Sequence, residues 1–252
     1  MTTTSPPESR SRRPALDRPR TAELAAVENA RFVALVESLQ PEHWSLPTDC
    51  PGWDVRAMVA HVVGAMEGQV SKREFVHQLR AGSSAAGDRP QVDGINEVQI
   101  RERATMGPLD LTARLAELAP RAADARARRS RLMRRVSFPQ EVGGRAERWT
   151  LGFLNDVVYT RDTWMHRVDI SRVIGRQVEL TSDHDGVLVR DVVQEWAGRH
   201  RQPFSLTLTG PAGGVFGAGA DGPPLELDAV EFCRVVSGRG SGPGLLAQPV
   251  PF

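Results

Sequence analysis

Cysteine is scarce in this chain, since only Cys50 and Cys233 occur among 252 residues. The two lie far apart, and neither belongs to a Cys-x-x-Cys pair. The chain therefore has neither the dense cysteine framework of a small secreted protein nor a cysteine-based zinc site. A reducing compartment suits this usage, and we expect a cytoplasmic protein.

An excess of charge of either sign is missing too, because 32 basic residues face 31 acidic ones. No overall field draws such a chain to nucleic acid. Long apolar runs are also absent, since none approaches the roughly 20 residues that span a bilayer. The segment from Met1 to Arg20 lacks the apolar core of a secretory signal. We expect no nucleic-acid or membrane partner, and a disordered tail over residues 1–20.

Helical periodicity dominates the N-terminal two thirds of the chain. Hydrophobic residues make up 40% and charged residues 25%, as in ordinary globular domains. Apolar residues recurring every three to four positions predict four helical regions, at residues 21–39, 53–79, 94–136 and 151–174. Residues 81–87 and 137–148 are expected to be loops, and Pro120 to bend or divide the third region. Four such regions favour an up-down four-helix bundle over residues 21–176.

The pattern changes after Arg176. Residues 204–209 alternate as Phe-Ser-Leu-Thr-Leu-Thr, and a Gly-Pro turn leads into residues 213–219. This alternation predicts a β-hairpin, flanked by helical segments at residues 185–198 and 228–236. We expect a small C-terminal α/β domain over residues 177–252, and an α+β fold class for the whole chain.

Four side chains of the helical part have the chemistry of metal ligands. Asp162 and His166 are four residues apart, so they share a helix face, and Asp169 lies on the same stripe. His61 interrupts an apolar helix face that points into the predicted bundle. Two imidazoles and a carboxylate make a three-ligand site with one open position. A hydrogen-bonded core histidine and a solvated Asp/His pair are the alternatives that spacing leaves open.

Two motifs resemble a known family. Residues 47–56, Pro-Thr-Asp-Cys-Pro-Gly-Trp-Asp-Val-Arg, run into Val-Ala-His at residues 59–61. Residues 161–170 read Arg-Asp-Thr-Trp-Met-His-Arg-Val-Asp-Ile, and Ser-Gly-Arg follows at residues 237–239. These segments resemble the mycothiol-dependent maleylpyruvate isomerase family. The resemblance extends from about residue 21 onward.

The resemblance implies a DinB-like bundle whose divalent metal, commonly zinc, is held by His61, Asp162 and His166. The family's carboxylate ligand is typically Glu, so Asp162 departs from the pattern by one methylene, and Asp169 is the substitute to consider. The resemblance further implies mycothiol as a thiol co-substrate. A metal-activated thiolate would then attack a small electrophilic substrate, in an isomerase or a thiol S-transferase.

Arginines and the remaining reactive side chains complete the sequence hypothesis. Arg239 is the candidate catalytic residue for an anionic substrate or intermediate, with Arg234 as a weaker one. Cys50 is not nominated as a nucleophile, and Trp53 and Trp164 are expected in the core or the pocket wall. Three further histidines have no partner at the spacing of metal ligands: His77, His184 and His200. Acidic residues flank His184 on both sides.

Two hypotheses from other classes stay open. One is a non-catalytic metal-binding or regulatory protein that keeps the bundle without the chemistry. The other is a nucleic-acid binder that uses the seven arginines between Arg121 and Arg135. A solvated helix face is the simpler interpretation of that run, although it would also attract a ligand's carboxylates or phosphates.

Overall fold

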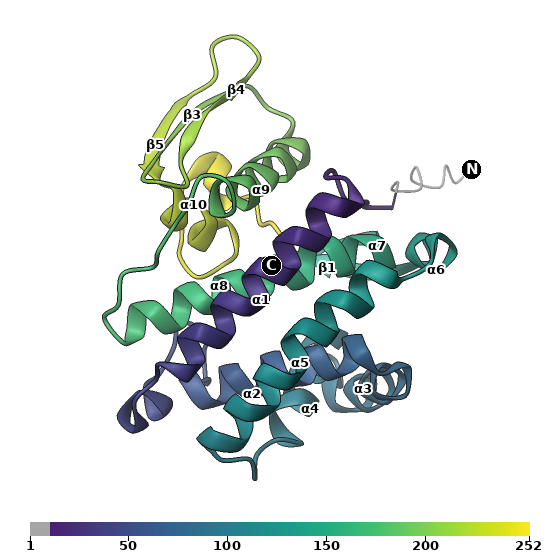
Figure 1. Ribbon diagram of the computed structural model, residues 1–252. Coiled ribbons are helices and arrows are strands. Elements are labelled where there is room, and N and C mark those ends of the chain that lie inside the picture. The colour runs from purple at the N-terminus through teal and green to yellow at the C-terminus, as the bar shows by residue number, and fades with distance from the viewer. Residues whose placement is uncertain (1–10) are drawn as a thin grey trace, which may run out of the picture.

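The computed structural model describes residues 11–252 (Figure 1). The first half of the predicted tail, residues 1–10, lies outside the described residues. Its second half is joined to the fold, because Arg12 forms a β-bridge with Trp149 and helix α1 (Arg18–Glu37) begins there. Asp17 caps α1 by accepting a hydrogen bond from the backbone N–H of Arg20, and so starts the helix before residue 21.

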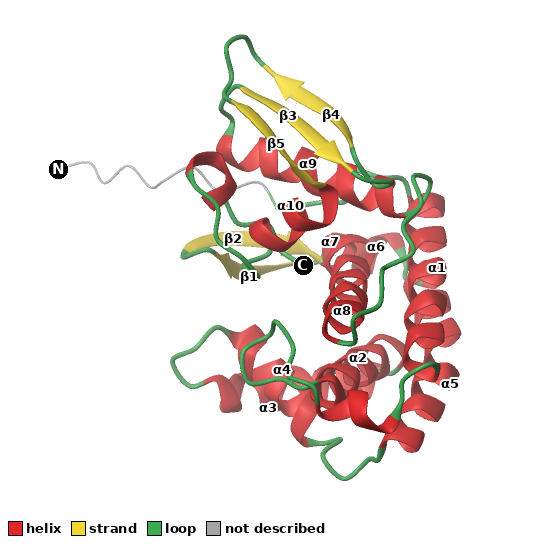
Figure 2. Ribbon diagram, turned by 90° about the vertical axis from the view of Figure 1, so that its left-hand side faces the viewer, coloured by secondary structure: helices red, strands yellow, loops and turns green. Residues whose placement is uncertain are grey.

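The N-terminal part is helical, as predicted. Helix α5 (Pro108–Arg128) packs on α1 and on α2 (Val55–Val70), and α8 (Tyr159–Val173) contacts the same two helices (Figures 1 and 2). Their facing sides bury large apolar side chains, among them Phe32, Met58, Leu115 and Ile170. A short 3₁₀ turn, η1 (Pro41–Ser45), lies between α1 and α2.

The second predicted helical region is two helices, and the predicted loop at residues 81–87 is wrong. The chain turns at Ser71, which caps α3 (Lys72–Ala86), and α4 (Gln91–Arg101) packs closely on α3. A Cβ atom on Gly94 would lie 2.1 Å from the carbonyl oxygen of Gly82. The small residues that suggested a flexible loop therefore form a close helix–helix contact.

The predicted loop at residues 137–148 is also wrong, because most of it is a β-hairpin. Strand β1 (Ser137–Val142) pairs antiparallel with β2 (Arg145–Thr150). The connecting Gly143 and Gly144 have φ values of +57° and +73°, the left-handed conformation that a tight hairpin turn needs. A two-glycine turn was the signal in the sequence for this hairpin.

The last helical region is continuous with one irregularity. It comprises α7 (Leu151–Phe153), a π-helical turn (Leu154–Val158) and α8.

Pro120 does not divide α5, and the helix ends at Arg128, before the short α6 (Arg131–Arg135). Proline lacks a backbone N–H, yet α5 continues through Pro120 without a break.

The C-terminal part is a small sheet covered by helices. Strand β3 (Phe204–Thr209) is central, antiparallel to β4 (Gly214–Ala218) and parallel to β5 (Pro224–Asp228). The predicted hairpin, formed by β3 and β4, is confirmed. Strand β5 was not predicted. Helices α9 (Asp185–His200) and α10 (Ala229–Val236) lie on one side of the sheet, and η3 (Gly244–Ala247) follows (Figure 2).

Helix α8 contributes to the cores of both parts. Its Trp164 and Val168 pack with Trp196 and Phe232 of the C-terminal part, whereas its Ile170 belongs to the core of the helical part. The helix that carries the candidate ligands is therefore held on two sides. No helix in the described residues is long and apolar enough to cross a membrane.

Candidate metal centre

Helices α2 and α8 bring the three predicted ligands together. Asp54 accepts a hydrogen bond from the backbone N–H of Ala57 and starts α2, which directs His61 toward α8. His61 is 5% exposed and His166 is 3% exposed, so both imidazoles lie in the interior between helices. Asp162 stands one helical turn before His166, and 22% of its side chain remains accessible.

The carboxylate of Asp162 lies between the two imidazoles. Its Oδ2 is 3.3 Å from His61 Nε2, and its Oδ1 is 3.2 Å from His166 Nε2. One ligand atom from each of the three residues can be chosen so that all lie within 4.8 Å of one another. Ligand atoms about 2.1 Å from a tetrahedral ion are separated by roughly 3.4 Å. The donor set and its spacing therefore fit a small divalent cation.

Asp162 supplies a negative charge beside the two imidazoles. Burial disfavours ionisation of Asp162, but attraction to His166 and His61 prevails and holds the pKa of Asp162 well below its ordinary value. Burial likewise opposes the charge on His166, and the Asp162 carboxylate overcomes it and raises the pKa of His166. His61 Nδ1 is buried without a hydrogen-bond partner among the described residues.

Asp169 occupies a different position from Asp162. Its Oδ2 is 3.4 Å from His166 Nδ1, on the side of the ring away from Asp162. It is fully buried, and both of its oxygens accept from Arg239 Nε, at 2.9 and 2.8 Å. The geometry thus places Asp162 among the candidate ligand atoms and Asp169 behind the histidine.

Arg239 lies behind His166 rather than across an open site from it. Its Nη2 is 3.4 Å from His166 Nδ1 and 3.6 Å from Cys50 Sγ. The contact of His166 Nδ1 with Arg239 needs an unprotonated nitrogen, whereas the contact with Asp169 needs a protonated one. If a metal were coordinated by Nε2, the protonated Nδ1 would donate a hydrogen bond to Asp169. Arg239 would then neutralise the charge of that carboxylate.

Arg234 is engaged elsewhere. Its Nη1 pairs with Asp49 Oδ2 at 2.5 Å, its Nε pairs with Glu231 at 3.1 Å, and Asp169 Oδ1 is 4.0 Å away. Arg234 therefore ties α10 to the loop before α2.

The two tryptophans and the cysteine have distinct surroundings. The ring of Trp53 lies 5.0 Å from His61 and 5.9 Å from His166, so it forms a wall of the site. Trp164 is fully buried and donates to Asp185 at 2.9 Å, as a core residue. Cys50 is half-buried with its Sγ 4.0 Å from Asp169 Oδ2.

Two further histidines have acidic partners that spacing in the sequence did not reveal. His77 pairs with Glu102 at 2.8 Å on the surface, and His184 pairs with buried Glu28 at 2.8 Å. Glu28 also binds Arg167, which in turn binds Asp185. This buried group joins α1, α8 and the start of α9. Its partners lie up to 156 residues apart in the chain, beyond the reach of spacing rules.

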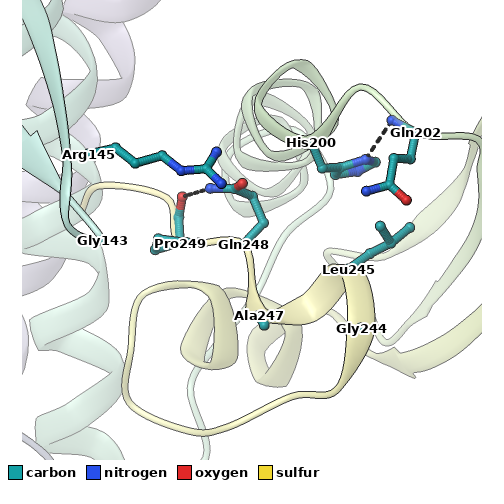
Figure 3. A pocket seen from close by; sticks show the side chains of 9 residues that line it. All are labelled: Gly143, Arg145, His200, Gln202, Gly244, Leu245, Ala247, Gln248 and Pro249. Carbon is teal, nitrogen blue, oxygen red and sulfur yellow. Dashed lines mark hydrogen bonds between the residues drawn. The ribbon is translucent and has the colours of Figure 1, made fainter.

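Two surface pockets lie outside the candidate metal centre. A pocket of 290 Å³ lies between the β1–β2 hairpin and the C-terminal part and is lined by Arg145, His200, Gln202 and Gln248, among others (Figure 3). His200 Nδ1 accepts from the backbone N–H of Gln202 there. A second pocket, of 420 Å³, lies beside Trp53, against Arg56 and Ile100. Neither contains His61, Asp162 or His166.

A family model described as the mycothiol maleylpyruvate isomerase N-terminal domain matches residues 25–171, more than half of the chain. The chain belongs to this family. The match confirms the resemblance drawn from the sequence motifs. It includes His61, Asp162 and His166, whereas Arg239 lies beyond its end.

Two solved structures resemble the chain over most of its length. They are described as the mycothiol-dependent maleylpyruvate isomerase and a histidine-to-alanine variant of it. Each is 17% identical, covers 90% of this chain and 91% of its own, and has a TM-score of 0.58. The shared fold spans both parts, which confirms the predicted helical N-terminal part with a small C-terminal α/β part. No curated protein sequence matches the chain significantly.

Proposed function

We propose that this protein is a metal- and mycothiol-dependent isomerase of the maleylpyruvate isomerase type. The observation that carries the proposal is the pair of buried imidazole Nε2 atoms facing one carboxylate at 3.2 and 3.3 Å, in a member of this family. His61, Asp162 and His166 would hold the cation, zinc first among the candidates. A metal-binding protein without activity and a thiol S-transferase are the alternatives that the experiment below separates.

The bound metal would act as a Lewis acid that lowers the pKa of a coordinated thiol. The chain's own residues prepare this position. The aromatic wall of Trp53 keeps water from one side of the two imidazoles. Asp169 would accept a hydrogen bond from the Nδ1–H of His166, which leaves the Nε2 lone pair free for a metal held beside Asp162. Arg239 balances the buried charge of Asp169.

The test is turnover of maleylpyruvate by the metal-loaded protein, with mycothiol, with a different low-molecular-weight thiol, and with none. Isomerisation that depends on both metal and mycothiol is the expected result. Accumulation of a stable thiol adduct would assign the protein as a transferase instead. Stoichiometric metal without turnover of maleylpyruvate or other small electrophiles would leave the non-catalytic alternative.

Asp169→Asn is expected to weaken zinc binding about 10- to 100-fold, because outer partners orient a ligand histidine and raise its basicity. The measurement is competition with a chromophoric chelator at neutral pH. Asp49→Asn is the matched control, since Asp49 also pairs with an arginine of the C-terminal part but touches neither histidine. Equal zinc affinity in parent and Asp169→Asn would contradict the positioning role.

The affinity for zinc is expected to fall as the pH is lowered. This fall should begin at a pH above the ordinary pKa range of histidine. The pKa of His166 is raised in the metal-free protein, so the proton that zinc must displace is held at higher pH. The pKa of Asp162 is depressed, so this carboxylate stays ionised and adds no proton. Below the raised pKa the apparent affinity should drop about tenfold per pH unit for each displaced proton. Chelator competition between pH 6 and 8 checks this, and a flat profile would contradict it.

A further inference from the structure

The arginine run between Arg121 and Arg135 does not form a single solvated face. Arg121 and Arg128 lie outside and pair with Glu117 and Asp124, one helical turn away. Arg126, on the same helix, is only 3% exposed. Arg129, just past the end of α5, is half-buried. Arg131 and Arg135 are exposed as well, and Arg134 is partly buried but pairs with Asp156. Within the run, Arg126 and Arg129 thus form an inner pair that is directed into the protein.

The inner pair, Arg126 and Arg129, has no acidic partner among the described residues. Arg126 Nη2 donates to Thr160 Oγ1 at 2.5 Å, and its Nε is buried without a partner. Arg129 Nη2 donates to the backbone carbonyl of Gln69 at 3.2 Å. A buried cation without a carboxylate is costly to a fold. Burial disfavours the charged guanidinium of Arg126 and lowers its pKa to about 9. The group still carries its charge at neutral pH.

Further polar groups surround the same place. The side-chain oxygen of Gln69 is buried without a hydrogen-bond partner. The guanidinium of Arg126 lies 5.9 Å from the ring centroid of Tyr159. Burial raises the pKa of Tyr159, so its phenol keeps the proton and remains a hydrogen-bond donor. Two cations and a donor thus lie near one another, and no carboxylate of the described residues forms an ion pair with either cation.

This region adjoins the candidate metal centre. Gln69 lies two helical turns beyond His61 on α2, and Tyr159 lies one turn before Asp162 on α8. At 1.5 Å per residue, the separations along the helix axes are about 12 Å and about 5 Å. Tyr159 and Arg129 are half-buried, and Asp162 is also partly accessible, so the region is not sealed from solvent.

We propose that Arg126 and Arg129 bind a carboxylate group of the substrate beside the metal centre. Guanidinium groups bind carboxylates through paired, charge-assisted hydrogen bonds. Held there, a small dicarboxylate or keto acid would lie beside Tyr159, one helical turn from Asp162. The inference rests on the proposed function and specifies its substrate class as a carboxylate anion. It also accounts for the unbalanced buried charge, since function can retain a feature that lowers stability.

The experiment measures binding of maleate, a small dicarboxylate, to the metal-loaded protein by calorimetry, with zinc content determined in parallel. Arg126→Met is expected to weaken maleate binding about tenfold or more. Arg128→Met is the matched control, because that side chain is exposed and paired with Asp124; its affinity should equal that of the parent. Arg126→Met should also be at least as stable as the parent in chemical denaturation, since it removes a buried unpaired charge.

Unchanged maleate affinity in Arg126→Met, or a metal-loaded parent that binds no maleate at millimolar concentration, would overturn the proposal. If Arg126→Met does not fold, Arg129→Gln serves instead, with the same loss expected and the same outcome overturning it. A parent that takes up no zinc but binds maleate through Arg126 would refute the proposed metal chemistry while leaving the anion site intact.

Discussion

His166→Ala should lose its metal and its thiol-dependent activity together. The remaining donors, His61 and Asp162, would form a two-ligand site, which is too few for stable zinc binding in a protein. Lewis-acid stabilisation by a bound metal contributes several kcal/mol, so activity should fall by about three orders of magnitude. His61→Ala should behave in the same way. Metal content per chain, measured on protein purified without a histidine tag, is the first readout, followed by turnover with mycothiol.

His77→Ala is the matched control for these variants, because His77 pairs with Glu102 on the surface and lies outside the candidate centre. It should keep parental metal content and activity. Asp162→Glu provides a second comparison, since it restores the longer carboxylate typical of the family and should retain the metal. A metal-free parent, or a His166→Ala variant with full metal and full activity, would demote the two histidines to core residues.

Arg167→Met should destabilise the fold by about 3–5 kcal/mol, the usual result of removing one partner from a buried ion pair. Arg167 binds Glu28 through Nε and Nη2, at 2.6 and 3.1 Å, and Asp185 at 2.7 Å. Both carboxylates have fully buried side chains, so neither can be hydrated when the guanidinium is removed. The free energy of unfolding from urea titration is the measurement.

Two comparisons make this second prediction specific. Arg172→Met removes an arginine of the same helix whose side chain is 50% exposed and faces Asp49 at 3.6 Å; its effect should stay within about 0.5 kcal/mol. Adding Glu28→Gln to Arg167→Met should recover part of the lost stability, because one of the stranded charges is removed. A loss below 1 kcal/mol in Arg167→Met would mean that the network contributes little.

The sequence predicted the elements whose signals are local. Apolar periodicity and the alternation of residues 204–209 each act within a few residues, and the corresponding helices and strands are present. The cap at Asp17 was not predicted, because that residue fell in the segment expected to be a disordered tail. The two wrong loop predictions have a common origin. Gly82 and its neighbours suggested a loop, although their small size serves a contact with Gly94 on another helix. The glycine pair at Gly143 was counted as loop composition rather than as a hairpin turn.

For the candidate site, the sequence alone determined that Asp162, His166 and Asp169 share one helix face, because helical periodicity is a property of the local backbone. It could not decide which carboxylate faces the imidazoles. The tertiary structure decided that, by bringing Arg239 from the C-terminal part onto Asp169 and His61 from α2 onto Asp162. It also decided which arginines of one run are paired outside and which are buried without a partner. These outcomes depend on packing between segments distant in the chain, which no local pattern encodes.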